Sequence, residues 1–289
     1  CVLPQSPETR SHCMGSKPRR LVICLALVSS MGSKLLASGA VMVNAESSEP
    51  NGRGLAVFTL LRGGTSIGAY DSFIHSRRCL RAAMPRVLEF DDIAFHAGDV
   101  PVELQPTLRE QISSRLLFVD ARDYGGFRDT AVQLLPTTRP SEQLEYSIGY
   151  RHMCHFMSML WFHALREYEY AMRVDDDVCV INFPAASLFG ALTADYAYGL
   201  ETQESHRETV ETFGPWLLEY ASNDGLRLNE VPPDRIFFTN FFVARIGWWH
   251  QPKVWRFLHA VNESGGIYRH RWGDAPIMTV ALKLHTTPG

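Results

Sequence analysis

The alternation of short apolar runs with longer amphipathic segments constrains the fold of this chain most strongly. Runs with the length and composition of buried strands cover residues 55–61, 86–90, 115–119, 170–174, 196–200 and 241–246. Helical patterns cover residues 66–84, 101–113, 141–166, 205–221, 252–261 and 275–284, with Ser141 as the expected N-cap of the third. This order predicts an α/β fold whose mixed, mostly parallel central sheet is flanked by helices. Ligands of such sheets bind beyond the carboxyl ends of the strands.

The first 50 residues have a different character from the rest. Basic residues between 17 and 20 precede an apolar run at 21–28, and a weaker apolar run covers 35–43. A basic patch before a short apolar run is typical of a secretory signal, although the run is shorter than the ~20 residues of a membrane span. We expect residues 1–50 to be a signal peptide or a signal anchor plus linker, and residues 51–289 to be a single domain.

Charge and cysteine content exclude some classes of protein. The formal net charge is −3, so the chain lacks the excess of positive charge with which proteins grip nucleic acid. Beyond the N-terminal segment the cysteines are Cys79, Cys154 and Cys179, an odd number at irregular spacing. This pattern predicts at most one disulfide, and three buried thiols are favoured over a metal role.

Three consecutive carboxylates, Asp175, Asp176 and Asp177, directly follow the apolar run at 170–174. Such a cluster repels itself unless a cation or solvent relieves it, and Mg²⁺ or Mn²⁺ prefers these oxygen ligands. In an extended segment Asp175 and Asp177 would share one face and Asp176 would point away. Two interpretations stay open at this point, a divalent-metal site and a solvated acidic turn.

A second cluster, His152, Cys154 and His155, lies in the helical pattern at 141–166. The two histidines are three residues apart and share a helix face. A zinc site needs further ligands at a recognisable spacing, and none follow nearby. We therefore expect histidines that are satisfied within the helix packing.

Three segments in this order resemble the fungal α-1,2-mannosyltransferase family, glycosyltransferase family 15. YRHMCHF at 150–156 is close to the family's YRHMCRF, and RVDDDV at 173–178 stands where the family has RVEPDV. SGGIYRHRWGDAP at 264–276 is close to SGGFYYERWGDAP and precedes a similar helix. In the first half, LLR at 60–62 alone is similar to the family's donor-binding LAR.

The resemblance implies a GT-A fold for residues 51–289 and a retaining transfer from GDP-mannose with Mn²⁺, or Mg²⁺ in its place. It also implies a type II membrane protein of the Golgi lumen, with secretion or the endoplasmic reticulum as alternatives. It assigns the metal to Asp175 and Asp177, which match the Glu and Asp of the family's EPD. Donor contacts are implied for Arg62, Tyr150, Arg151 and Arg173. Acceptor contacts are implied for Asn240, Trp272 and Asp274, the last also as a catalytic group.

Two departures from the family affect the expected chemistry. Phe242 occupies the position of a family Glu that is considered the nucleophile, so direct front-face displacement or another carboxylate is needed. Glu201, which follows a predicted strand, is our candidate for that carboxylate. The family's metal-binding His lies beyond the helix that follows WGDAP, and His285 comes too early for it. We expect that position to fall after Gly289.

The leading hypothesis is a hexosyltransferase that acts on a glycan or glycoprotein acceptor in the secretory pathway. The replacement at Phe242 keeps two alternatives open, a transferase for another nucleotide sugar and a non-catalytic relative that binds nucleotide sugar or glycan. A metal-dependent hydrolase is less favoured, because such an enzyme needs a second carboxylate across the scissile bond and the sequence identifies none.

Overall fold

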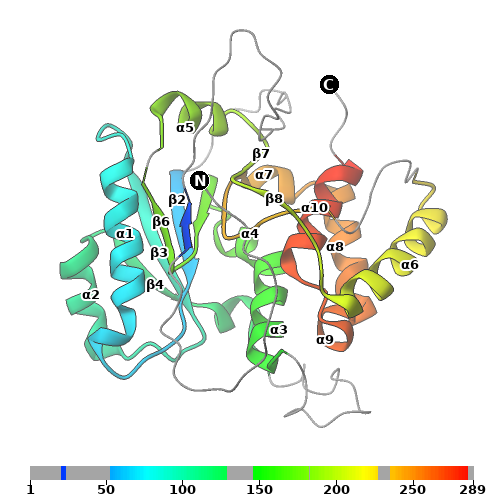
Figure 1. Cartoon of the computed structure of the whole chain (residues 1–289), viewed down its shortest axis with the longest axis horizontal. Helices are drawn as coiled ribbons and strands as arrows, with labels where there is room; N and C mark the ends of the chain where they lie inside the picture. Colours follow the sequence, from blue (N-terminus) through cyan, green and yellow to red (C-terminus); the bar gives the residue numbers. More distant parts are fainter. Residues whose placement is uncertain (1–20, 24–52, 129–145, 182, 227–234, 286–289) are drawn as a thin grey trace, which may run out of the picture.

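A six-stranded sheet forms the centre of the molecule in a computed structural model that describes residues 21–23, 53–128, 146–181, 183–226 and 235–285 (Figure 1). The order is β4-β3-β2-β5-β10-β7; the first four strands are parallel, and β10 is antiparallel to β5 and β7. The bounds are β2 Arg53–Leu60, β3 Phe90–His96, β4 Leu116–Asp120, β5 Tyr168–Val174, β7 Tyr196–Tyr198 and β10 Phe241–Arg245. The predicted mixed, mostly parallel sheet is confirmed.

Helices cover both faces of this sheet (Figure 1). On one side lie α1 Asp71–Ala83, which a 3₁₀ turn at Ile67–Tyr70 precedes, and α2 Gln105–Ile112, with α5 Ala185–Ala191 farther along the chain. On the other side lie α3 Ile148–His155, a π turn Phe156–Leu160, α4 Trp161–Ala164, α6 Arg207–Asn223, α7 Ile246–Trp249, α8 Pro252–Ser264, α9 Gly266–His270 and α10 Asp274–His285. Each strand therefore buries alternate side chains in two cores, as β2 does with Phe58 and Val57.

Two small strand pairs extend the fold. β1 Leu21–Ile23 runs parallel to β6 Val178–Val180, and β8 Glu201–Gln203 runs antiparallel to β9 Arg235–Phe237. No helix in the described part of the chain is both long and apolar enough to span a bilayer. Most of the expected signal segment lies outside the described residues, so a signal peptide or anchor stays a prediction.

The prediction of a strand at 86–90 is wrong for all of its residues but the last. Val87 is 84% exposed, and the strand β3 begins where the prediction ended, at Phe90. Two aspartates interrupt the apolar pattern of β3, so the sequence pattern does not indicate that this strand is buried. Asp92 is fully buried because Arg77 of α1 donates from Nε to its Oδ1 at 2.8 Å.

The predicted helix at 141–166 begins later and is less regular than expected. Residues 141–145, with the expected cap Ser141, lie outside the described residues. The described helix α3 is capped by Ser147, whose hydroxyl accepts a hydrogen bond from the Tyr150 amide at 3.3 Å. The remaining predicted helices and the strands at 55–61, 115–119, 170–174, 196–200 and 241–246 are confirmed with shifted ends.

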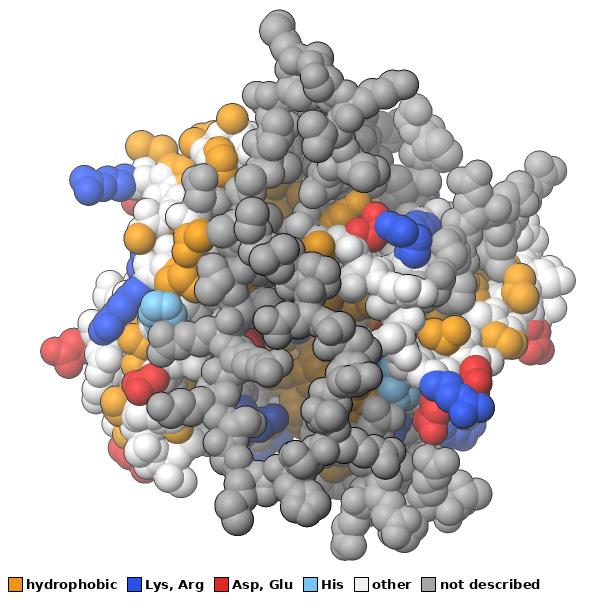
Figure 2. Space-filling view, viewed as in Figure 1, with side chains coloured by type: hydrophobic (Ala, Val, Ile, Leu, Met, Phe, Trp, Pro, Cys, Tyr) orange, Lys and Arg blue, Asp and Glu red, His pale blue; other side chains and the backbone are white. Residues whose placement is uncertain are grey.

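On the described part of the face in Figure 2, basic and acidic side chains lie interspersed at the two flanks. They do not gather there into a patch of one sign. Such a mixed distribution gives a weak field for steering a strongly charged polymer.

Acid is expected to destabilise the fold through His285, at the end of α10. Its ring is buried, and burial lowers its pKa from 6.5 to about 4. The unfolded chain therefore binds a proton that the folded chain excludes, and stability is lost as the pH falls from 6.5 towards 4. Urea unfolding measures how far the free energy of unfolding falls between pH 7 and pH 4. We expect this fall to be smaller in His285→Gln than in the wild type, by on the order of 2 kcal/mol. An unchanged loss would contradict a buried neutral imidazole.

Candidate functional site

The candidate site lies where the strand order of the sheet reverses. From β2 the chain adds β3 and β4 on one side, and then β5 on the other. The crevice beyond the carboxyl ends of such neighbouring strands is the usual ligand position in an open α/β sheet. Arg62 follows β2 and residues 175–177 follow β5, so the fold brings these two predicted groups to the same edge.

Residues 175–177 form a tight turn, here called the acidic turn. The Val178 amide donates to the Asp175 carbonyl at 3.1 Å, so the expected extended arrangement is wrong. Asp175 and Asp176 are half-buried and Asp177 is exposed. Burial and the neighbouring Asp177 raise the pKa of Asp176, against the opposing charges of Arg77 and Arg62. Arg62 is therefore close enough to the acidic turn to interact with its charge.

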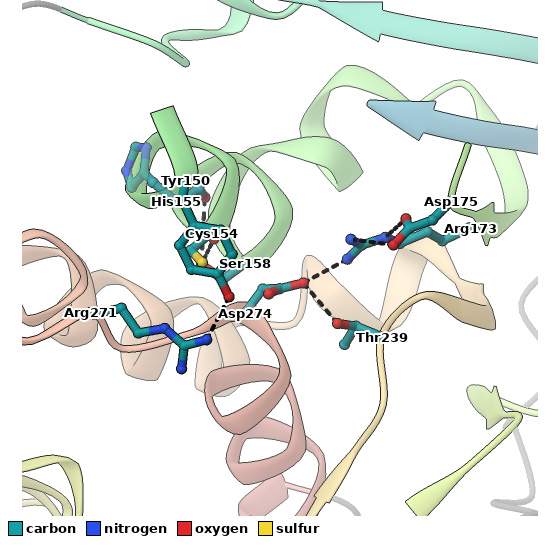
Figure 3. Close-up of polar contacts among 9 residues, drawn as sticks. All are labelled: Tyr150, Cys154, His155, Ser158, Arg173, Asp175, Thr239, Arg271 and Asp274. Atoms are coloured by element: carbon teal, nitrogen blue, oxygen red, sulfur yellow. Dashed lines mark hydrogen bonds and ion pairs between the residues drawn. The ribbon is translucent and has the colours of Figure 1, made fainter. Parts of the chain in front are cut away.

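Arg173 links the acidic turn to the start of α10. Its guanidinium donates to Asp175 Oδ1 at 2.7 Å and to Asp274 Oδ2 at 2.6 Å, and all three of its nitrogens contact carboxylates (Figure 3). Thr239 adds a fourth hydrogen bond to these carboxylates, from its hydroxyl to Asp274 Oδ2 at 2.8 Å. Burial raises the pKa of Asp175 to about 6, although Arg173 opposes the shift. Arg173 thus holds two predicted site carboxylates in one buried network.

Asn240 joins this network through its backbone. Its carbonyl accepts from the Asp175 amide at 3.1 Å, so it holds the first residue of the acidic turn. The residue is 8% exposed, and its Nδ2 has no hydrogen-bond partner among the described residues. A buried amide without a partner costs free energy unless a ligand or water accepts from it. Asn240 therefore has a free donor beside the carboxylate cluster.

Trp272 does not have the exposed position that the acceptor contact implied by the resemblance would need. The ring is 2% exposed and packs against Phe213 and Trp216, while its Nε1 donates to the Thr212 hydroxyl at 2.8 Å. A sugar platform needs an open ring face, and this ring has none in the structure. Core packing, not acceptor contact, explains Trp272 here.

Tyr150 pairs with a residue that the sequence reasoning missed. Arg271 donates from Nη2 to the Tyr150 hydroxyl at 2.7 Å, and its guanidinium lies over the rings of Tyr146 and Tyr150. Within the described part of the chain, Arg271 Nε and Nη1 are buried without hydrogen-bond partners, although Glu204 lies 3.6 Å from Nη1. The signal was present in the sequence, because this arginine directly precedes WGDAP.

Arg151 is buried between α3 and α9. It is 2% exposed, and its Nη1 donates to the Tyr268 carbonyl at 2.8 Å, so it ties α3 to α9. The predicted contact of Arg151 with a donor nucleotide would have to use other donors of its guanidinium. Its role in the structure is to hold two helices together.

The two histidines of α3 bind neighbouring helices. His152 Nδ1 lies 3.1 Å from the Tyr268 hydroxyl, and His155 Nε2 lies 2.9 Å from Asn262 Oδ1. Each ring has a hydrogen-bond partner on α9 or α8, as expected, although His155 Nδ1 is buried without a partner among the described residues. Cys154, between them, is a buried free thiol, and burial raises its pKa to about 12.

The candidate carboxylate Glu201 is not brought into the network around Asp274. It lies on β8, and its Oε1 accepts from Arg235 Nε of β9 at 2.9 Å. Phe242 is fully buried among the rings of Phe58, Trp161 and Tyr196. The position of the family's Glu is therefore an aromatic core in this chain.

His285 cannot complete a metal site at the acidic turn. It ends a 12-residue helix that begins at Asp274, so its Cα lies ~16 Å along the helix axis from that residue. Its ring packs near Phe257 at a centroid distance of 6.1 Å. This position agrees with the expectation that His285 does not replace the family's metal-binding His.

Two of the three body cysteines form a disulfide, which agrees with the prediction of at most one bridge and corrects the interpretation as three buried thiols. Cys79 of α1 and Cys179 of β6 are bonded across 100 residues of sequence. Within the described residues, His75, Cys79 and Cys179 form the one group of three potential metal ligands with ligand atoms inside 4.8 Å. The two sulfurs are bonded to each other, so this group is not a metal site in the oxidised protein.

The fold defines a class of protein. Core-mannan synthase A (CmsA/Ktr4) from Aspergillus fumigatus, in an Mn/GDP form, superposes with a TM-score of 0.64 and 16% identity over 89% of this chain and 78% of that chain. The mannosyltransferase Ktr4p from S. cerevisiae in complex with GDP superposes with a TM-score of 0.66 and 19% sequence identity. This match covers 86% of this chain and 70% of that chain. At such low identity these likenesses define the fold alone, which is that of a GT-A-like glycosyltransferase.

The chain belongs to the glycolipid 2-alpha-mannosyltransferase family, whose model matches residues 123–288. O-glycoside alpha-1,2-mannosyltransferase omh1 of Schizosaccharomyces pombe is 29% identical over 47% of this chain and 39% of its own length. The probable mannosyltransferase KTR3 of Saccharomyces cerevisiae is 31% identical over 48% of this chain and 38% of its own length. The chain thus matches about two fifths of the length of these relatives.

Proposed function

We propose that this protein is a metal-dependent hexosyltransferase that transfers mannose from GDP-mannose to a glycan or glycoprotein acceptor. The observation that carries the proposal is the acidic turn at the reversal of the strand order, with Arg62 beside it and Arg173 linking it to Asp274. Mn and GDP in the Aspergillus structure, and GDP in the yeast one, support the choice of metal and nucleotide. The basic patch at 17–20 and the apolar run at 21–28 support a place in the secretory pathway, with the Golgi lumen as our choice.

Asp175 and Asp177 would hold the metal. Carboxylate oxygens suit Mn²⁺ and Mg²⁺, and the exposed Asp177 has free lone pairs for a cation. A bound metal would neutralise charge on the leaving diphosphate. Arg62 is exposed beside the turn and would bind phosphate oxygens in a bidentate manner. Arg173 keeps Asp175 in place from the buried side.

Asp274 and Asn240 would orient the acceptor sugar. Asp274 Oδ2 is used by Arg173 and Thr239, and hydrogen bonds to its other oxygen would come from an acceptor hydroxyl. The free Nδ2 of Asn240 would donate to a second oxygen. Because Phe242 leaves the nucleophile position apolar, we propose retention through direct front-face displacement. In that route the acceptor hydroxyl attacks on the side from which the diphosphate leaves.

A non-catalytic nucleotide-sugar-binding protein is the second candidate. The buried phenyl ring of Phe242 and the ion-paired Glu201 favour it, since neither position offers a free carboxylate to the reaction. Such a relative would bind the donor with the metal and would release it unchanged. A transferase for another nucleotide sugar would keep the same metal and diphosphate contacts.

Calorimetric titration of the full chain with GDP-mannose and with UDP-glucose, with and without Mn²⁺, tests the proposal. We expect GDP-mannose to bind only with Mn²⁺, and we expect Asp177→Asn to weaken this binding by on the order of 100-fold. Loss of a residue behind a metal ligand typically lowers metal affinity about 10–100-fold, and loss of a direct ligand should cost at least the upper end of that range. Glu211→Gln, at an exposed i,i+4 ion pair of α6, is the matched control and should bind as the wild type does. Binding of neither donor by the folded protein would refute the metal–diphosphate assignment.

Transfer of labelled mannose to an α-mannoside acceptor then separates the two candidates. Turnover of bound donor supports the transferase, and binding without turnover supports the non-catalytic relative. Preference for UDP-glucose would keep the site and change the donor.

A further inference from the structure

Helix α1 is attached to the backbone on both sides of the acidic turn. On the entry side, Ser76 Oγ donates to the Asp175 carbonyl at 3.1 Å and Arg77 Nη1 donates to the Val174 carbonyl at 3.1 Å. On the exit side, the Cys79–Cys179 disulfide joins the same helix covalently to β6. One helix therefore fixes both ends of the turn.

The two ends are held with unequal strength. The entry side continues β5 in the middle of the sheet, and the Asn240 carbonyl adds a further hydrogen bond to the Asp175 amide. The exit side leads into β6, a three-residue strand whose described backbone partner is β1 and whose Val178 and Val180 side chains are buried in the core. Asp177 directly precedes this strand. Its position therefore depends on the disulfide more than that of Asp175 does.

We propose that the Cys79–Cys179 disulfide is a positioning element of the metal site: it fixes the Asp177 side of the acidic turn, so that the oxidised form binds the metal more tightly than the reduced form. The inference rests on the proposed function, because it takes Asp175 and Asp177 as the metal ligands. In the reduced protein Ser76 and Arg77 still hold Asp175. Asp177 then has to be ordered when the metal binds, and the entropy of ordering lowers the affinity.

The disulfide is accessible to a reductant. Cys79 is half-buried, and the exposed His75 lies beside it with Nε2 3.5 Å from Sγ. A dithiol such as dithiothreitol supplies two electrons and two protons, which convert the S–S bond into two thiols while the dithiol becomes a cyclic disulfide. The other described cysteine, Cys154, is a buried free thiol and takes no part in this exchange.

The test compares Mn²⁺ affinity in the two redox states of the full chain. Free Mn²⁺ is measured by electron paramagnetic resonance in the presence of GDP, with oxidised protein and with protein reduced by dithiothreitol and desalted without air. We expect reduction to weaken Mn²⁺ binding about tenfold, as loss of a supporting group behind a metal ligand does. The double variant Cys79→Ser/Cys179→Ser should show the weak affinity in both treatments. Equal affinity of the oxidised and reduced wild type would overturn the inference.

Two further measurements separate positioning from a general loss of stability. GDP binding without Mn²⁺ should be the same in both redox states. Val254→Ala, in the fully buried part of α8, lowers stability far from the turn and should keep the wild-type Mn²⁺ affinity. If Val254→Ala weakens Mn²⁺ binding as much as reduction does, the inference fails. If the oxidised wild type binds no Mn²⁺, the proposed function itself fails, and this inference with it.

Discussion

Replacement of Arg173 by Met is expected to lower the free energy of unfolding by about 3–5 kcal/mol at pH 7, the usual cost of removing one partner of a buried ion pair. The guanidinium is the shared partner of Asp175 and Asp274, and the side chains of Arg173 and Asp274 are nearly inaccessible to solvent. The substitution leaves both carboxylates without their cation, in a place where water replaces it poorly. Urea unfolding followed by circular dichroism measures the loss.

The pH dependence of this variant distinguishes lost charge pairing from lost packing. Burial already raises the pKa of Asp175, and removal of Arg173 takes away the charge that opposes this shift, so the folded variant binds more protons than the unfolded chain. Its free energy of unfolding therefore rises as the pH is lowered from 7 to 5, and part of the loss is recovered. Arg207→Met, which breaks an exposed ion pair with Glu211, is the control and should cost under ~0.5 kcal/mol. A loss below ~1 kcal/mol for Arg173→Met would contradict the buried network.

Introduction of the family's carboxylate by Phe242→Glu is expected to destabilise the protein by about 3–5 kcal/mol and to leave mannose transfer no faster. Phe242 is fully buried and contacts the rings of Phe58, Trp161 and Tyr196. A carboxylate there has no cation on the described side chains that contact the ring. Chemical denaturation and a transfer assay at matched folded concentrations measure the two effects.

Phe242→Leu provides the control, because it keeps the position apolar while it removes three side-chain carbons. We expect it to cost about 2 kcal/mol, less than Phe242→Glu does. A Phe242→Glu variant that stays folded and transfers mannose faster than the wild type would show that the pocket accepts a nucleophile. It would also remove the reason for proposing front-face displacement.

The sequence predicted local features well wherever a single segment carries the signal. The apolar run at 170–174 predicted β5, and the alternation of such runs with helical patterns predicted the mixed sheet. The segment at 264–276 carried the family resemblance, which the family match at residues 123–288 confirms. These signals are local because strand burial and helix periodicity repeat along neighbouring residues.

Predictions failed where a contact from another part of the chain overrode the local pattern. The strand β3 was missed because Asp92 is buried against Arg77, which stabilises a charge where the pattern demands an apolar residue. The extended form expected for the acidic turn was wrong because hydrogen bonds from Ser76 and Val178 hold the Asp175 carbonyl in a turn. Spacing alone identified neither partner.

The sequence by itself determined the α/β architecture, the family and the position of the carboxylates after β5. Only the tertiary structure decided which of the cysteines are bonded, that Trp272 is a core residue, and that Arg173 joins Asp175 to Asp274. The physical reason is that periodicity and motifs are properties of neighbouring residues. Disulfides, buried ion pairs and ring packing arise between residues that the fold brings together from separate segments, 101 positions apart for Arg173 and Asp274.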